Sequence, residues 1–185
     1  MHSGPSDSYR GGYVLETVDL GGQPSVADSL GSRWRVVLAF TAEIRRGDKQ
    51  VLFADSIMKV NGDGQMKRRI ILVTEAALYT LDHRWCNLKR RVSLTAIDRL
   101  YLSELNDNFL AIIVPSEYDF FLASTRKNEL VTVLVNTPRS SKLTSIQVSF
   151  ANRFEYRVDS KTSRIVHFEE AEGNPTKVLH QACTF

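Results

Sequence analysis

Short runs of alternating hydrophobic and polar residues follow one another from about residue 49, which is the pattern of β-strands. Seven runs before residue 124 are rich in Val, Ile, Leu, Tyr and Phe and are bounded by turn residues. They are Gln50 to Lys59, Arg69 to Val73, Ala77 to Leu81, Lys89 to Leu94, Ile97 to Leu102, Phe109 to Val114 and Asp119 to Ala123. Seven strands in so short a stretch predict a small barrel or sandwich.

Two of the connections between these runs carry hairpin turn chemistry. The sequence Asn-Gly-Asp-Gly occupies residues 61–64, and Asn-Asp-Asn occupies residues 106–108. These residue types tolerate the positive φ that tight hairpins require. Both segments therefore predict antiparallel hairpins in an up-and-down sheet.

A single helix is predicted after the seventh strand, over about residues 125–137. Ser124 or Thr125 can cap its N-terminus, Glu129 falls near the capping-box position, and Pro138 ends the segment. Apolar residues recur along it at spacings of three and four, which gives one apolar face. The sequence therefore predicts a helix that closes one end of an open barrel.

β patterning returns beyond the helix, while the N-terminal part of the chain is less regular. Four further runs predict a small C-terminal β subdomain: Ile146 to Phe150, Phe154 to Val158, Arg164 to Phe168 and Val178 to Gln181. Residues 1–33 are expected to be a largely irregular leader, and the apolar run at 35–44 fits either a helix or a buried strand. We expect a core over residues 34–138 and a β extension over 139–185 that packs on it.

Composition places the chain among ordinary globular proteins and makes its charge a local matter. It is 43% hydrophobic and 24% charged, and 24 Lys and Arg oppose 21 Asp and Glu for a net charge of +3. That excess is too small for a whole-molecule nucleic-acid binder. Residues 59–91, however, hold eight basic and three acidic side chains, a net +5 that exceeds the charge of the entire chain.

The sequence offers no constellation for catalysis, for a metal or for a cofactor. The two cysteines, Cys86 and Cys183, lie far apart without ligand spacing, which favours reduced thiols in a cytosolic protein. The four histidines lack metal-site spacing, and no nucleophile, P-loop or dinucleotide motif occurs. The sequence also contains neither a signal peptide nor an apolar run long enough to span a membrane, so any membrane association is expected to be peripheral.

The hairpin around residues 61–64 carries the most suggestive chemistry. Lys59 ends one of its strands and Arg69 begins the next, so we expect their side chains to approach each other at one barrel opening. Lys67 and Arg68 lie beside Arg69 and are added on electrostatic grounds. A phosphorylated inositol head group needs several such donors converging from different strands. The sequence thus predicts a phosphoinositide site at Lys59, Arg69, Lys67 and Arg68.

The order of these motifs resembles the tail homology 1 domain of class I myosins. The matching segments are Val-Leu-Phe-Ala from Val51, then Lys59, Arg-Ile-Ile-Leu-Val-Thr from Arg69, Ala-Leu-Tyr-Thr-Leu from Ala77, Lys-Arg-Arg-Val-Ser-Leu from Lys89, Asn-Asp-Asn-Phe from Asn106 and Thr-Arg-Lys-Asn-Glu-Leu from Thr125. The resemblance covers about residues 35–181. It implies a pleckstrin-homology-like core with a C-terminal β extension, acidic phospholipid binding, and a phosphoinositide role for Lys59 and Arg69.

The resemblance also implies a cellular setting. It suggests a non-catalytic membrane anchor, monomeric as an isolated domain, that lies at plasma or endosomal membranes. A motor and a light-chain-binding neck would precede it, with actin bound through the motor. Many family members carry basic residues in the hairpin turn, where this chain has Asn61 to Gln65, which favours a weaker or less selective hold on the head group.

Three readings of the remaining residues stay open. The basic run that includes Lys89 and Arg91, together with Arg84, could extend the membrane patch, or it could be an exposed strand end. Most aromatic residues at strand spacing belong to a core, but Trp85 lies in a cationic loop from which it could enter the interfacial layer of a membrane. The rival to lipid binding is a protein-interaction module for a cytoskeletal or adaptor partner.

Overall fold

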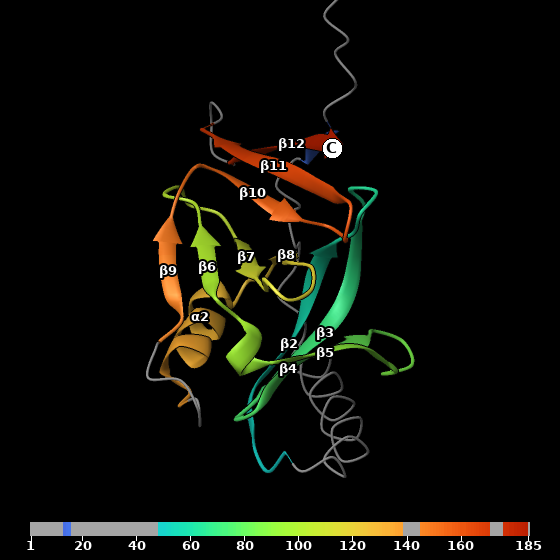
Figure 1. Cartoon of the computed structure of the whole chain (residues 1–185), viewed down its shortest axis with the longest axis vertical. Helices are drawn as coiled ribbons and strands as arrows, with labels where there is room; N and C mark the ends of the chain where they lie inside the picture. The colour runs from blue at the N-terminus through green and yellow to red at the C-terminus, as the bar shows by residue number, and fades with distance from the viewer. Residues whose placement is uncertain (1–12, 16–47, 139–144, 171–175, 185) are drawn as a thin grey trace, which may run out of the picture.

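The computed structural model describes residues 13–15, 48–138, 145–170 and 176–184, which form two β-sheets and one α-helix (Figure 1). The larger sheet has the strand order β5-β4-β3-β2-β8-β7-β6-β9, and the smaller has the order β1-β12-β11-β10. The strands are β1 (Tyr13–Leu15), β2 (Val51–Val60), β3 (Met66–Thr74), β4 (Ala77–Asp82), β5 (Leu88–Ser93), β6 (Arg99–Leu102), β7 (Phe109–Ile113), β8 (Phe120–Ala123), β9 (Gln147–Phe150), β10 (Arg153–Arg157), β11 (Thr162–Glu169) and β12 (Lys177–Thr184).

The seven predicted strands of the barrel are all present as β2 to β8, and a short 3₁₀ helix, η2 (Leu94–Ala96), links β5 to β6. Neighbouring strands of this set are antiparallel wherever they pair, and β2 pairs with β8 as well as with β3. The single α-helix in the described residues, α2 (Lys127–Asn136), follows β8 as expected. The mainly β fold class with one capping helix is therefore confirmed.

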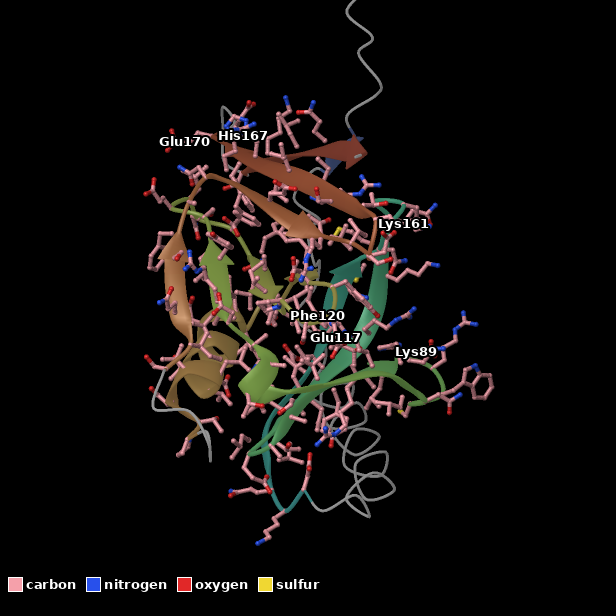
Figure 2. All side chains as sticks on the ribbon, viewed as in Figure 1. Lys89, Glu117, Phe120, Lys161, His167 and Glu170 are labelled. Atoms are coloured by element: carbon pink, nitrogen blue, oxygen red, sulfur yellow. The ribbon has the colours of Figure 1, made fainter. Side chains whose placement is uncertain are left out.

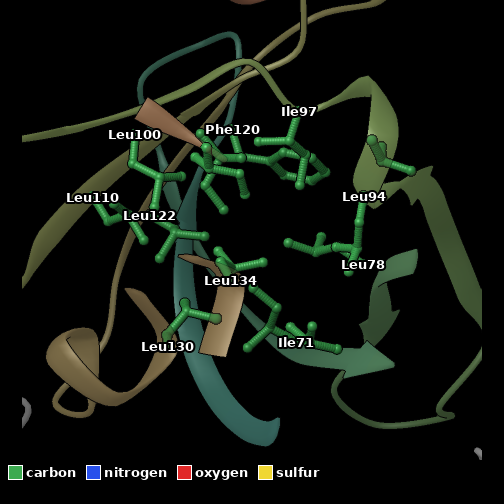
Figure 3. Close-up of a cluster of buried hydrophobic side chains, with 14 of the residues drawn as sticks. Ile71, Leu78, Leu94, Ile97, Leu100, Leu110, Phe120, Leu122, Leu130 and Leu134 are labelled. Carbon is green, nitrogen blue, oxygen red and sulfur yellow. The ribbon is translucent and has the colours of Figure 1, made fainter. Parts of the chain in front are cut away.

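The larger sheet folds over on itself around one apolar core (Figure 3). Alternation along each strand sends one set of side chains inward, and these include Ile57, Ile71, Leu78 and Leu122, each at most 1% exposed. Leu130 and Leu134 on the apolar face of α2 close this core, and both are fully buried. Burial of each such side chain contributes roughly 1.5–3 kcal/mol relative to exposure.

The start of α2 differs from the predicted capping box. Its N-cap residue is Arg126, and neither Ser124 nor Thr125 occupies that position. The Ser124 hydroxyl accepts from the Arg126 backbone N–H at 3.0 Å, one step before the helix. The Arg126 guanidinium instead joins Glu129, donating to its two carboxylate oxygens at 2.5 and 2.8 Å. Glu129 therefore accepts hydrogen bonds from the Arg126 side chain and not, as a capping box requires, from the backbone N–H of the N-cap residue.

The smaller sheet lies against the outer face of the larger one, at the end where the β2–β3 turn lies (Figure 1). A second apolar core joins the two sheets, because alternation on β7 and β8 sends Phe109 and Phe121 outward, opposite to the side chains of the first core. Their rings stack with centroids 5.3 Å apart, and Phe121 also meets Tyr156 of β10 at 5.2 Å. The smaller sheet is therefore fixed on the larger one by aromatic packing.

Two strands pair differently from the sequence expectation. The run near Ile146 was expected in the C-terminal subdomain, but β9 adds in parallel to β6 at the edge of the larger sheet. Tyr13–Leu15 was expected to lie in an irregular leader, yet it forms β1 and pairs antiparallel with β12. Both pairings join segments far apart in sequence, which local patterns do not reveal.

Two further predictions from the sequence are not tested by the structure. The apolar run at residues 35–44 lies outside the described residues, and the division of the chain into units at 34–138 and 139–185 stays a prediction. Among the described helices, none combines the length and the apolar character that crossing a bilayer requires.

Candidate anion-binding site

The β2–β3 hairpin reverses at residues 61–65, where a sharp turn was predicted. Gly64 has φ 85°, a conformation that glycine adopts without steric cost. The Asn61 N–H donates to the Gln65 carbonyl at 2.8 Å, and the Gly64 N–H donates to the Asn61 carbonyl at 3.0 Å. The predicted chain reversal is confirmed.

The β4–β5 and β7–β8 loops lie at the same end of the sheet as the β2–β3 turn, because adjacent strands are antiparallel. We call this end of the sheet the hairpin end.

The strand register decides which of the predicted cations share a face. Lys59 lies directly opposite Lys67, and Ile57 lies opposite Arg69, so Lys59 and Arg69 are diagonal neighbours on the inward face. Arg68 pairs with Met58 on the other face and is exposed. Three of the four predicted residues thus face the same way, and Arg68 does not join them.

Arg90 on β5 is a further cation on this inward face. It lies opposite Thr80, which in turn lies opposite Ile71 on the same face as Arg69. Arg90 is 8% exposed, and its guanidinium lies over the Tyr118 ring, 3.6 Å from the ring centroid. It pairs with Glu117 at 3.1 Å and also donates to the Tyr118 carbonyl. The β7–β8 loop therefore holds Arg90 at the hairpin end.

Lys59 combines partial burial with the lack of an acidic partner among the described residues. It is half-buried, with its Nζ 5.7 Å from the Tyr118 centroid and 5.6 Å from the Phe120 centroid. Burial lowers the pKa of the Lys59 ammonium, and the positive charges of Arg90 and Arg69 lower it further. Within the described parts of the chain, no carboxylate lies within ion-pair distance of Lys59. We call Lys59, Lys67, Arg69 and Arg90 the cationic cluster.

Two carboxylates flank the cationic cluster without neutralising its centre. Asp82 pairs with Arg69 at 3.4 Å, and Glu117 pairs with Arg90. Asp82 also accepts from the backbone N–H groups of Arg84 at 3.0 Å and Trp85 at 3.3 Å, and these bonds lower its pKa. The cluster retains exposed donors on Lys67 and part-exposed donors on Arg69, since the Arg69 side chain is 20% exposed. Such a set can bind an anion with several phosphate groups.

The predicted secondary patch is divided by the structure. Lys89 and Arg91 lie on the outer face of β5, while Arg90 faces inward, because successive residues of a strand point to opposite faces. Arg91 is tied to the sheet, donating to the Tyr79 hydroxyl at 2.9 Å and pairing with Asp48 at 3.4 Å. Lys89 lies beside the β4–β5 loop, on the same side of the view as Lys161 of the smaller sheet (Figure 2). Arg84 is exposed in that loop.

Sequence reasoning missed Arg90 and its partner Tyr118. Alternation along a strand places Arg90 on the face opposite to Lys89, but no local pattern places an aromatic ring beneath its guanidinium. No group of three or more His, Cys, Asp or Glu side chains in the described segments is arranged to hold a metal ion.

Comparison with protein families gives one match over most of the chain. A family model described as "Unconventional myosin tail, actin- and lipid-binding" matches residues 27–184. The match spans the whole larger sheet and β10 to β12 of the smaller one, and it includes every residue of the cationic cluster.

Curated relatives are heavy chains of class I myosins. The chain is 29% identical over 133 residues to myosin heavy chain IB of Acanthamoeba castellanii, covering 69% of this chain and 12% of that protein. It is 28% identical over 137 residues to myosin IB heavy chain of Dictyostelium discoideum, covering 71% and 12%. It is 23% identical over 136 residues to human unconventional myosin-Ib, covering 69% and 12%. The chain thus spans about an eighth of the length of these relatives.

Solved structures with a similar arrangement are more distant. The N-terminal PH domain of human ARAP2 is 17% identical with a TM-score of 0.42, covering 50% of this chain and 84% of that one. The hSac2 domain of the human phosphoinositide phosphatase Sac2 is 11% identical with a TM-score of 0.43, covering 64% and 89%.

Proposed function

This chain belongs to the unconventional myosin tail family, as a tail homology 1 domain of class I myosins, and from that premise we propose that its cationic cluster binds phosphoinositide head groups. The family is described as lipid-binding. The finer claim, that Lys59, Arg69, Lys67 and Arg90 recognise the phosphorylated sugar, rests on the geometry at the hairpin end. Arg68 contributes only attraction to the surface from the opposite face.

The observation that carries the proposal is the half-buried ammonium of Lys59, which has aromatic neighbours but no acidic partner among the described residues. A half-buried cation beside two guanidinium groups destabilises the free fold unless an anion neutralises it. Proteins keep such arrangements where function needs them, at a cost in stability. A phosphate at the cluster would lie against Lys59, Arg69 and Arg90 together and would reverse that cost.

Binding proceeds in two stages in this proposal. The net +5 charge of residues 59–91 first attracts the domain to an anionic surface, where each basic side chain contributes about 1 kcal/mol. A head group then reaches the cluster, where guanidinium forks bind phosphate oxygens and Lys59 acts as a point charge. Arg69 can turn from Asp82 to a phosphate because that ion pair is long, at 3.4 Å, and partly exposed.

The proposal extends to the longer protein in which such a domain acts. The chain would be the tail of a cytoplasmic motor, held at the periphery of plasma or endosomal membranes. The motor and the light-chain-binding neck would lie in the remaining length that its relatives have, and the motor would engage actin. The domain would then transmit force between the actin cytoskeleton and the bilayer, with no catalytic step of its own.

A series of vesicle co-sedimentation measurements tests the lipid specificity. Vesicles of phosphatidylcholine would carry phosphatidylserine, a singly phosphorylated phosphoinositide or a multiply phosphorylated phosphoinositide, at matched total negative charge and at two salt concentrations. The expected order of binding rises with phosphorylation and persists at the higher salt. Equal binding to all three at low salt, lost at high salt, would show diffuse attraction alone and would contradict recognition by the cluster.

A second candidate function is direct contact with actin through β9. The family description includes actin binding. β9 is an edge strand of the larger sheet, and its Val148 and Phe150 are 36% and 64% exposed. Edge strands with exposed apolar residues are favourable sites for a protein partner. Co-sedimentation with actin filaments that is insensitive to salt, and that is lost in Phe150→Ser, would support this function over lipid binding.

A further inference from the structure

Trp85 is the most exposed large hydrophobic side chain in the described residues. It is 77% exposed, in the loop between β4 and β5. Tryptophan is rarely left in water without a partner, because its ring offers a large apolar area for burial. Its position at the hairpin end therefore calls for a binding role.

The loop that carries Trp85 is built to hold it outward. At its base the Asp82 N–H donates to the Asn87 carbonyl at 2.8 Å, and the Cys86 N–H donates to the Asp82 carbonyl at 2.9 Å. Cys86 has φ 54°, an uncommon conformation for a residue with a side chain. The Trp85 N–H itself is held by the Asp82 carboxylate. These bonds define one loop conformation with the indole on the outside.

Asp82 connects this loop to the cationic cluster. One of its carboxylate oxygens accepts from the loop N–H groups of Arg84 and Trp85, while the other pairs with Arg69. A single side chain therefore contacts both the backbone of the loop that carries Trp85 and the guanidinium proposed to bind a phosphate. A flat surface that delivers a head group to Arg69 also meets the β4–β5 loop, since both lie at the hairpin end.

The surroundings of Trp85 select an anionic bilayer as the partner. Arg84 and Lys89 are exposed on either side of it, and no ion pair is found for their side chains among the described residues. Asp82, the acidic residue of the loop, is already engaged. An aromatic ring flanked by cations matches the membrane interface, where tryptophan lies at the level of lipid head groups that carry negative charge.

We propose that Trp85 inserts its indole into the interfacial layer of an anionic membrane while the cationic cluster holds a head group. The proposal rests on the phosphoinositide binding argued above and adds a second, apolar contact. It fixes the orientation of the domain, with the β4–β5 loop toward the bilayer and β9 at the opposite edge of the larger sheet.

Fluorescence and sedimentation together test the insertion. In Trp34→Phe, Trp85 is the only tryptophan, because the chain has two. Phosphatidylcholine vesicles with phosphatidylserine and a multiply phosphorylated phosphoinositide should shift its emission to the blue, and brominated lipids should quench it. Sedimentation with the vesicles but without shift or quenching would overturn the insertion and leave head-group binding standing. No sedimentation of the unaltered protein would overturn both.

A second comparison needs no change at Trp34. Trp85→Ala should weaken vesicle binding about tenfold, equivalent to about 1.4 kcal/mol, whereas its affinity for soluble inositol hexakisphosphate should stay unchanged. Trp85→Phe, which keeps an aromatic ring, should recover most of the vesicle binding. Unaltered vesicle binding in Trp85→Ala would contradict the proposal. A loss of both affinities in Trp85→Ala would also contradict it, because the residue would then act through the cluster.

Discussion

The guanidinium of Arg164 on β11 donates a hydrogen bond to the carbonyl oxygen of Gly62 in the β2–β3 turn, which lies 102 positions earlier in the chain. A Cβ added at Gly62 would lie 3.1 Å from Cγ1 of Val158, so the turn is in close contact with the smaller sheet. The turn that joins the strands of Lys59 and Arg69 is therefore braced by the C-terminal part of the chain. The smaller sheet therefore contacts the hairpin that carries the candidate site.

Replacing Arg164 by Met is expected to weaken both the fold and lipid binding. The hydrogen bond from a charged donor is worth about 1.5–3 kcal/mol, and its loss leaves the Gly62 carbonyl without this donor. The free energy of unfolding should fall by about that amount in urea titrations, and phosphoinositide vesicle binding should fall as the hairpin loosens. Arg153→Met, on the exposed face of β10, is the matched control and should change neither. Full vesicle binding by a destabilised Arg164→Met would show that the brace serves stability alone.

Replacing Lys59 by Met is expected to stabilise the domain while it removes head-group binding. The substitution keeps the apolar stem over Phe120 and removes an ammonium whose pKa is lowered by burial and by Arg90 and Arg69. We expect a gain of about 0.5–2 kcal/mol in the free energy of unfolding at neutral pH.

The gain from Lys59→Met should depend on pH with a defined sign. Because the folded pKa of Lys59 is lowered, the unfolded chain holds more protons between the two pKa values, so wild-type stability rises with pH there. The advantage of Met should therefore shrink as the pH approaches the ordinary lysine value of about 10.4. Lys67→Met, at an exposed position, should stay within about 0.5 kcal/mol of wild type. A loss of stability in Lys59→Met would contradict the claim that the Lys59 charge destabilises the folded domain.

The junction between the two sheets is expected to weaken in acid because of His180. This residue is 2% exposed, its ring lies 5.1 Å from Phe121, and burial followed by the charge of Arg164 lowers its pKa to about 4. The fold holds the His180 imidazole in its neutral form. As the pH falls below about 6.5, the imidazole of the unfolded chain takes up a proton before that of the folded chain does, which favours unfolding. Stability should be fully present above pH 6.5 and should decline by roughly 3 kcal/mol as the pH falls to about 4.

Thermal melts of His180→Phe across the same pH range check this account. The substitution keeps a ring against Phe121 and removes the titration, so the decline between pH 6.5 and 4 should become shallower. His167→Phe, at an exposed position on β11, should leave the decline unchanged. A decline of the same depth in His180→Phe would mean that other groups cause it.

Most of the fold follows from patterns that are local in the sequence. Alternation and turn residues gave β2 to β8 and α2 with ends within a few residues, because each run and its bounding turn lie within about ten positions. The parallel pairing of β9 with β6 and the pairing of β1 with β12 were not predicted. Both depend on which distant edges meet, and nothing within either strand encodes that choice.

The candidate site was predicted in part for a related reason. Composition located the basic segment and the turn located the hairpin, but a register difference of one residue decides whether Arg68 or Arg69 faces inward. Arg90 was not among the predicted site residues, and its place in the cluster depends on Tyr118, which the β7–β8 loop supplies from 28 positions away. The brace between Arg164 and Gly62 is equally non-local.

The most direct test of the cationic cluster is the double variant Lys59→Ala with Arg69→Ala. Its binding to phosphoinositide vesicles is measured by co-sedimentation. The charge-matched control is Arg153→Ala with Lys177→Ala on the smaller sheet, and thermal melts confirm that both proteins are folded. The account predicts that the cluster variant loses phosphoinositide binding, while the control retains it. Intact binding by a folded cluster variant would contradict the account.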